Sequence, residues 1–240
     1  MPTANMSRAT GLYASAVALN NMGVSLIDKG AYKEAVHTLK DAVKVLQVVT
    51  SGQPVSPDVE NGVQQLLQRA SRQVCLSTNV ADNAEQLVLC YDRGVTTSGT
   101  GHVFSKSMER IFAICIEDET DDLEQSEVDI HSAIVLQNLA VAHLHILETE
   151  NDDQQARKVH NSAIEIAVLA CNILAKVSNE SQNTEYTLGM VALTCLFRNL
   201  LAAGRLQEAE DTLRRLYSLK IEEERASALL FPSAKPAAAA

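Results

Sequence analysis

The stretch that decides the fold is residues 18–46, which reads ALNNMGVSLIDKG from 18 to 30 and AYKEAVHTLKDAVKVL from 31 to 46. Apolar residues in both halves recur at the i, i+3, i+4, i+7 spacing of an amphipathic helix. Between the halves stands Gly30, a residue that readily takes the left-handed conformation with which helices end. The sequence therefore predicts two antiparallel helices joined by a tight turn.

Small residues occupy the positions where these two helices are expected to touch. Gly23 lies in the middle of the first helix, where a glycine costs about 1 kcal/mol relative to alanine. Ala35 and Ala42 lie on one face of the second helix. A chain tolerates a glycine there when another backbone comes close, so we expect the two helix backbones to lie nearly in contact.

The residues of this hairpin resemble the tetratricopeptide repeat (TPR), a helix-turn-helix unit that stacks into solenoids. The matching residues are Gly23, Gly30, Tyr32, Ala35, Leu39 and Ala42. The run ALNNMG at 18–23 is most similar to the subclass found in kinesin light chains. The resemblance implies an all-α, right-handed superhelical stack of hairpins that binds partners. It also implies that Asn21 faces the concave groove and hydrogen-bonds the backbone of a bound peptide.

A second copy of the pattern spans residues 126–176. Asn138 stands where Asn21 stands, and Ala140 stands where Gly23 stands. The small positions of its second helix are Ala156 and Ala163. The spacing from Ala140 to Ala156 is longer than the spacing from Gly23 to Ala35, the matching residues of the first copy. This copy therefore resembles the family with about four extra residues at its turn.

A third copy spans residues 184–220. Gly204, Ala209 and Leu213 match Gly30, Ala35 and Leu39 position for position. Phe197 stands at the position of Gly23, and Cys195 stands at the position of Asn21. The third hairpin is therefore expected to be less tightly packed, and the row of asparagines along the groove to be incomplete.

The remaining segments are less regular. Residues 1–9 are expected to be a disordered lead-in to the first hairpin, over 10–49, and residues 226–240 a disordered tail. Residues 50–125 hold a third helix, with Ser56 as its cap, and an irregular insertion. In that insertion two short apolar runs, 86–91 and 110–116, can pair as a small antiparallel β-ribbon. A helix over 105–115 is the alternative.

Composition narrows the range of partners and compartments. The 240 residues carry a formal net charge of −10, which argues against nucleic acid and anionic membrane as partners. Five cysteines without CxxC spacing are typical of reduced thiols in an intracellular protein. The first residues lack the apolar stretch of a signal peptide, and we find no run of roughly 18 apolar residues that could span a bilayer. We expect a cytoplasmic protein, with organelle import left open.

Catalytic and metal-binding motifs are missing from the sequence. It holds no GxSxG, HExxH or GxxxxGK[ST] pattern. His143 and His145 lie two apart on an expected helix and point in different directions, so they cannot share a metal. We predict that the chain is not an enzyme and takes no cofactor or metal, with a catalytic site in residues 77–124 as the less favoured alternative.

The sequence thus predicts a non-catalytic scaffold that binds a protein or peptide in the groove of a helical stack. Asn21 and Asn138 are the candidate peptide-binding residues, because a side-chain amide offers both a donor and an acceptor to an extended main chain. Self-association into a homo-oligomer is the alternative.

Overall fold

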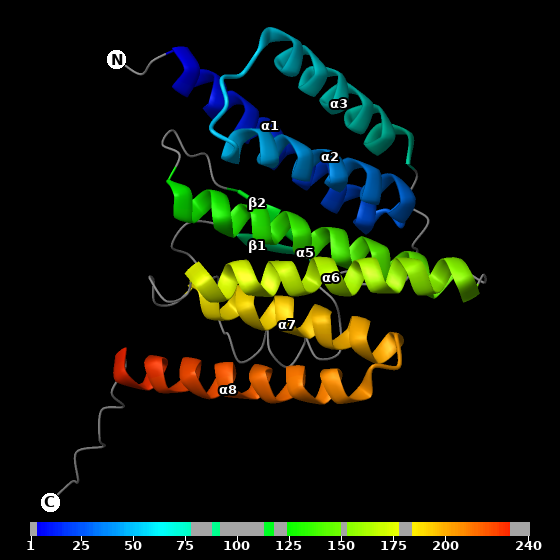
Figure 1. Ribbon diagram of the computed structural model, residues 1–240, viewed down its shortest axis with the longest axis vertical. Helices are drawn as coiled ribbons and strands as arrows, with labels where there is room; N and C mark the ends of the chain where they lie inside the picture. Colours follow the sequence, from blue (N-terminus) through cyan, green and yellow to red (C-terminus); the bar gives the residue numbers. More distant parts are fainter. Residues whose placement is uncertain are drawn as a thin grey trace, which may run out of the picture.

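Helices stacked side by side make up nearly all of the structure (Figure 1). This computed structural model describes residues 4–77, 88–91, 113–117, 124–149, 153–177 and 184–230. Within those ranges the prediction of an all-α chain with two short strands in its insertion is confirmed. The helices are α1 (Ala4–Asp28), α2 (Tyr32–Thr50), α3 (Pro57–Leu76), α5 (Gln125–Thr149), α6 (Asp153–Val177), α7 (Thr184–Ala202) and α8 (Leu206–Leu230), and the strands are β1 (Val88–Tyr91) and β2 (Ala113–Ile116).

The helices form three hairpins, and each hairpin packs on the next. The pairs α1–α2, α5–α6 and α7–α8 are the hairpins that the sequence predicts, while α2 contacts α5 and α6 contacts α7. The third helix, α3, packs on α1 at one end of the stack, and α8 lies at the other end (Figure 1). Ser56 caps α3 as expected, because its hydroxyl accepts a hydrogen bond from the Val59 N–H at 3.4 Å.

Glycines in the left-handed conformation end the first helix of two hairpins. Gly30 has φ 75° and Gly204 has φ 71°, which confirms the predicted turns. In the first turn, the N–H of Gly30 donates to the Ile27 carbonyl and the N–H of Ala31 donates to the Leu26 carbonyl, both at 2.9 Å. The turn after α7 repeats this pattern of bonds through Gly204 and the residue that follows it.

The close approach predicted at Gly23 is present, but its partner differs from the expected one. A Cβ built on Gly23 would lie 2.6 Å from Cγ of Leu39, well inside van der Waals contact. The group that fills the space is therefore a leucine side chain of α2, not the α2 backbone. Leu39, Ala35 and Ala42 are all fully buried, so α2 presents its apolar face to α1.

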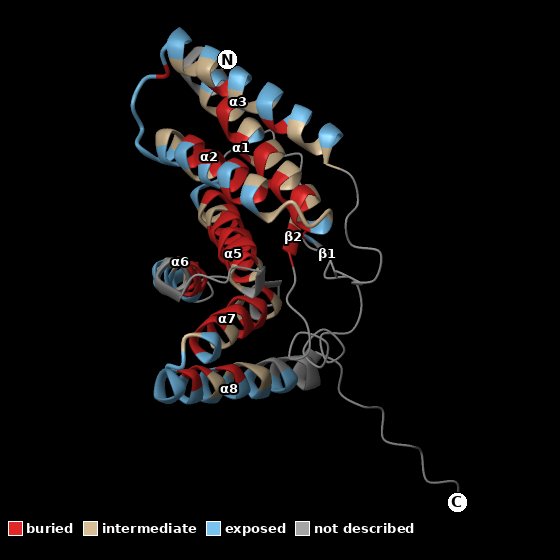
Figure 2. Ribbon diagram, turned by 90° about the vertical axis from the view of Figure 1, so that its right-hand side faces the viewer, coloured by how far each residue is buried: buried red, intermediate tan, exposed pale blue. Residues whose placement is uncertain are grey.

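Helix α5 is the central element of the core (Figure 2). Its segment Gln125–Leu147 is long and apolar enough to cross a membrane, a property that the sequence analysis missed. In this structure 83% of an 18-residue apolar stretch within that segment is buried. The neighbours that bury it are α1, α2, α6, α7 and β2. Burial on all sides accounts for its apolar composition, since a helix that is apolar all round packs inside a protein or a membrane.

Two boundaries differ from the prediction. Helix α1 begins at Ala4 rather than after residue 9, and Arg8 ties its first turns to α3 through an ion pair with Glu60 at 3.3 Å. Helix α8 continues to Leu230, beyond the predicted start of the tail at 226, and a Lys220–Glu224 pair at 3.7 Å lies just before that point. Residues 231–240 lie outside the described part of the chain.

The ribbon in the insertion is parallel, not antiparallel. Its register pairs Val88 with Ala113 and Tyr91 with Ile116. Parallel neighbours need a crossover of a dozen residues or more, and residues 92–112 are long enough to provide it. The alternative helix over 105–115 is wrong at Ala113, where β2 begins; residues 105–112 lie outside the described ranges.

Candidate functional site

The predicted peptide-binding asparagines bind the main chain of β2. Strand β2 contacts α1 and α5, the first helices of the first two hairpins. Figure 2 shows the two strands beside these helices. Asn21 on α1 is half-buried, and Asn138 on α5 is fully buried. Both therefore contact an extended segment of this same chain that is far from them in the sequence.

The Asn138 side chain binds both polar groups of Ile114. Its Oδ1 accepts a hydrogen bond from the Ile114 N–H at 2.7 Å, and its Nδ2 donates to the Ile114 carbonyl at 2.7 Å. Asn21 does the same for Ile116, since its Oδ1 accepts from the Ile116 N–H at 2.9 Å and its Nδ2 donates to the Ile116 carbonyl at 2.7 Å. Each amide thus substitutes for the hydrogen-bonding partner that a neighbouring strand would offer.

The other edge of β2 faces β1. In a strand, residues i and i+2 direct their main-chain N–H and C=O groups to the same side. The main-chain groups of Ala113 and Cys115 therefore point away from the asparagines. Glu117, the next residue of that series, donates its N–H to the Tyr91 carbonyl at 2.9 Å. Strand β2 therefore has main-chain partners along both edges, a strand on one side and helix side chains on the other.

Asn20 is the site residue that the sequence analysis missed. It is fully buried, and its Nδ2 donates to the Ile114 carbonyl at 3.2 Å and to Oδ1 of Asn21 at 3.1 Å. Its own Oδ1 accepts from Nδ2 of Asn138 at 2.9 Å, which joins the three amides into one network. The sequence does offer a signal, because Asn20 stands directly before the predicted site residue Asn21. Sequence alone, however, does not show which of two adjacent helix residues faces the neighbouring hairpin.

An aromatic cluster anchors β1 against the same two helices. The buried Tyr91 ring packs edge-on against the ring of His131 on α5, with centroids 5.4 Å apart. His131 in turn stacks on Tyr13 of α1 at 5.6 Å, and the Tyr13 hydroxyl is hydrogen-bonded to its Nδ1. Tyr13 and His131 each lie two turns before the asparagines of their helices, so both strands are fixed to one continuous face.

The side chains of β2 divide into a buried set and a half-exposed one. Ala113, Ile114 and Ile116 are each at most 2% exposed, whereas Cys115 is half-buried. Directly opposite Cys115 in the register is the exposed Cys90. A hydrogen bond to the Glu117 carboxylate, together with burial, raises the pKa of the Cys90 thiol to about 11. Burial raises the pKa of Cys115 as well, so both thiols are protonated at neutral pH.

The third hairpin carries no amide at the matching position. Cys195 of α7 is buried, and burial raises the pKa of its thiol to about 12. Asn199, one turn later, donates to the carbonyl of Cys195 at 2.9 Å within its own helix. At this position the third hairpin therefore has a buried thiol in place of an amide.

The repeat positions lie mostly in the core. Ala140, Ala163 and Ala209 are buried, and Leu213 is half-buried. Ala156 lies in α6, although its side chain is outside those described. The buried alanines among them lie at the positions where the repeat pattern expects close helix packing.

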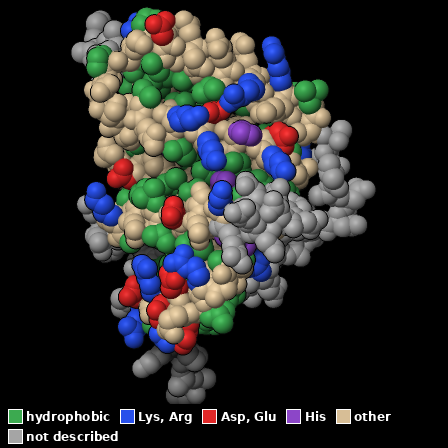
Figure 3. Space-filling view, turned by 45° about the vertical axis from the view of Figure 1, so that its right-hand side comes forward, with side chains coloured by type: hydrophobic (Ala, Val, Ile, Leu, Met, Phe, Trp, Pro, Cys, Tyr) green, Lys and Arg blue, Asp and Glu red, His purple; other side chains and the backbone are tan. Residues whose placement is uncertain are grey.

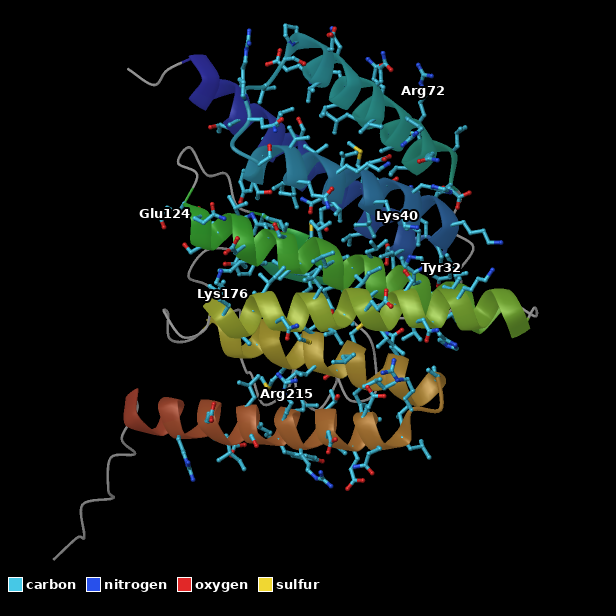
Figure 4. All side chains as sticks on the ribbon, in the orientation of Figure 1. Tyr32, Lys40, Arg72, Glu124, Lys176 and Arg215 are labelled. Carbon is cyan, nitrogen blue, oxygen red and sulfur yellow. The ribbon has the colours of Figure 1, made fainter. Side chains whose placement is uncertain are left out.

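A cavity of about 370 Å³ lies away from the asparagines, between α6, α7 and α8. Its lining is mainly apolar, with Arg215 and Glu222 among its charged residues. Figure 4 shows Arg215 on the side of α8 that faces α7. Burial raises the pKa of Cys171 in its wall to about 12, which makes that thiol a poor nucleophile. Within the described ranges, no three His, Cys, Asp or Glu side chains come together as a metal site.

Charge is unevenly distributed over the surface. Figure 3 shows Lys and Arg side chains gathered on the upper part of one face, whereas both signs alternate on the lower part. Exposed basic residues of the upper helices α2 and α3 include Lys33, Lys40, Lys44, Arg69 and Arg72. Some are paired locally, since Lys44 and Arg69 both contact Asp41. Basic side chains are thus common on α2 and α3 although the net charge of the chain is −10, and acidic side chains lie among them (Figure 3).

No family model matches the chain, and neither a curated protein nor a solved structure gives a match to it.

Proposed function

We propose that this chain is a non-catalytic, TPR-like scaffold that holds an extended peptide main chain on the first helices of its hairpins. The observation that carries the proposal is the bidentate binding of Ile114 by Asn138 and of Ile116 by Asn21. These bonds involve main-chain groups only, so they suit any extended segment of suitable shape. The repeated hairpin spacing supports the assignment to a helical repeat scaffold.

The mechanism follows from the chemistry of the amides. An asparagine side chain carries one acceptor and two donors, which is what the edge of a strand needs at every second residue. Because the three amides bond to one another, each is oriented before a peptide arrives, and little side-chain entropy is lost on binding. Selectivity would come from the apolar surroundings of the bound side chains at alternate positions.

Selection from a library of random peptides tests this function. Because β2 itself occupies Asn21, the peptides are selected against the variant Ile114→Ala/Ile116→Ala, whose own strand competes less. Adding Asn21→Ala to this variant should lower their affinity by about tenfold, because losing two main-chain hydrogen bonds costs on the order of 1–2 kcal/mol. The matched control is Asn161→Ala, since Asn161 is an exposed asparagine on α6. Equal affinities of that variant with and without Asn21→Ala would show that the peptides bind elsewhere.

A further inference from the structure

We propose that β2 is an intramolecular ligand of this groove, and that the scaffold's partner is an extended peptide of the same pattern, which binds in its place. This inference rests on the proposed function and adds the class of partner. The pattern has a small residue first and β-branched apolar residues at the second and fourth positions, as in Ala113-Ile114-Cys115-Ile116. The third position is open to variation.

The side-chain environment defines that pattern. Ala113 is 1% exposed, so a larger side chain at this position would have to displace packed neighbours. Ile114 and Ile116 are each 2% exposed, so both sites select large apolar side chains. A β-branched residue fits them best, because it favours the extended conformation that the asparagines require. Cys115 is half-exposed and adds no such requirement.

The helical stack does not depend on β2 for its continuity. Helix α1 contacts α5 directly, and α2 contacts α5 over a larger surface. The Asn20–Asn138 bond joins the two hairpins without any atom of β2. Exchange of β2 for an external strand would thus leave the hairpins packed as they are, and it would restore the same main-chain hydrogen bonds.

Competition with a tethered segment determines the affinity that an external peptide can show. A segment joined to its own site has an effective concentration on the order of millimolar, so it masks much of the intrinsic affinity of the groove. Weakening β2 should therefore strengthen external binding, because the fraction of open groove rises. This relation distinguishes an exchangeable ligand from a permanent part of the core.

The test measures binding of a fluorescent peptide with the sequence of residues 110–118 and serine at the position of Cys115, RIFAISIED. Binding is compared between the wild-type chain and the variant Ile114→Ala/Ile116→Ala, whose β2 loses its two buried side chains. We expect at least tenfold tighter binding to the variant. Equal affinities, or no binding to the variant, would overturn the inference.

Adding Asn21→Ala to that variant separates the inference from the proposed function. Loss of binding in this background shows that the peptide occupies the asparagine site. If binding of both RIFAISIED and the library peptides persists without Asn21, the proposed function fails. If only the library peptides depend on Asn21, the proposed function holds and the exchange of β2 is refuted.

A second measurement needs no change to β2. The alkylation rate of Cys115 by iodoacetamide, followed by mass spectrometry of the wild-type chain, reports release of the strand. Saturating RIFAISIED peptide should raise this rate severalfold, while Cys171 and Cys195, buried between helices, should not change. An unchanged rate for Cys115 in the presence of bound peptide would contradict exchange.

Discussion

The first two hairpins and the third follow one backbone pattern but differ in what their first helices contact. Helices α1 and α5 direct three asparagine amides at β2, whereas α7 carries Cys195 at the matching position. The turns of the first and third hairpins are alike, since Gly30 and Gly204 share the left-handed conformation. Hairpins with the same repeat spacing thus differ in the side chains that their first helices present, and only those with asparagine amides hold β2 among the described residues.

The packing inside the hairpins differs as well. Leu39 of α2 is fully buried against Gly23, whereas Leu213, its counterpart on α8, is only half-buried. Phe197 stands where Gly23 stands, so the leucine of the third hairpin has no gap to enter. The first hairpin should therefore be the less tolerant of added volume.

The largest expected effect is that of Gly23→Leu. A Cβ at this position would already lie 2.6 Å from Cγ of Leu39, so the larger side chain must push α1 and α2 apart. We expect a loss of about 3 kcal/mol or more in the free energy of unfolding, measured by urea denaturation. A variant as stable as wild type would refute the close contact.

Acidification should weaken the contact between the first and second hairpins. Burial and the nearby Lys40 cation lower the pKa of His143 on α5 to about 4, below the 6.5 of an exposed histidine. The unfolded chain takes up a proton at this position first, so stability falls as the pH drops from about 6.5 to about 4 and this loss is complete below that range. The loss is up to about 3 kcal/mol. In His143→Leu, thermal unfolding should show a weaker dependence on pH across this window.

Removing one amide of the network should cost less. In Asn138→Ala the Ile114 N–H and Oδ1 of Asn20 each lose a partner in a buried site. We expect a loss of about 2 kcal/mol, whereas Asn161→Ala on the exposed face of α6 should stay within about 0.5 kcal/mol of wild type. Equal effects of the two substitutions in urea denaturation would show that the network does not stabilise the fold.

The smallest effect is expected in the third hairpin. A Cβ on Gly189 of α7 would meet only a terminal methyl of Leu219, at 3.0 Å, and that methyl can move. Gly189→Ala should therefore change stability by less than about 1 kcal/mol, because the gain in helix propensity offsets the tighter contact. A loss as large as that of Gly23→Leu would remove the difference in packing between the first and third hairpins.

The sequence was sufficient to predict those features of the fold that depend on neighbouring residues. The apolar spacing predicted the hairpins, and the glycines predicted their turns at Gly30 and Gly204. Asn21 and Asn138 were singled out because their repeat positions match. The early start of α1 was missed, because the ion pair between Arg8 and Glu60 joins residues far apart in the sequence. The longer α8 was missed as well.

The occupant of the site could not be predicted. The main-chain partners of Asn20 and Asn21 lie more than 90 positions away, at Ile114 and Ile116. Whether β1 and β2 pair in parallel or antiparallel also depends on how the folded helices place the two strands. No local propensity determines such contacts, since they form only when α1 and α5 pack side by side.

Amide hydrogen exchange at Ile114 and Ile116 tests the central claim most directly, because it reports each main-chain N–H separately. The account predicts that both amides are protected in the wild-type chain. Asn21→Ala should accelerate exchange at Ile116 far more than at Ile114, and Asn138→Ala should do the reverse. Fast exchange of both amides in wild type, or equal acceleration of both by either substitution, would contradict the binding of a strand by helix asparagines.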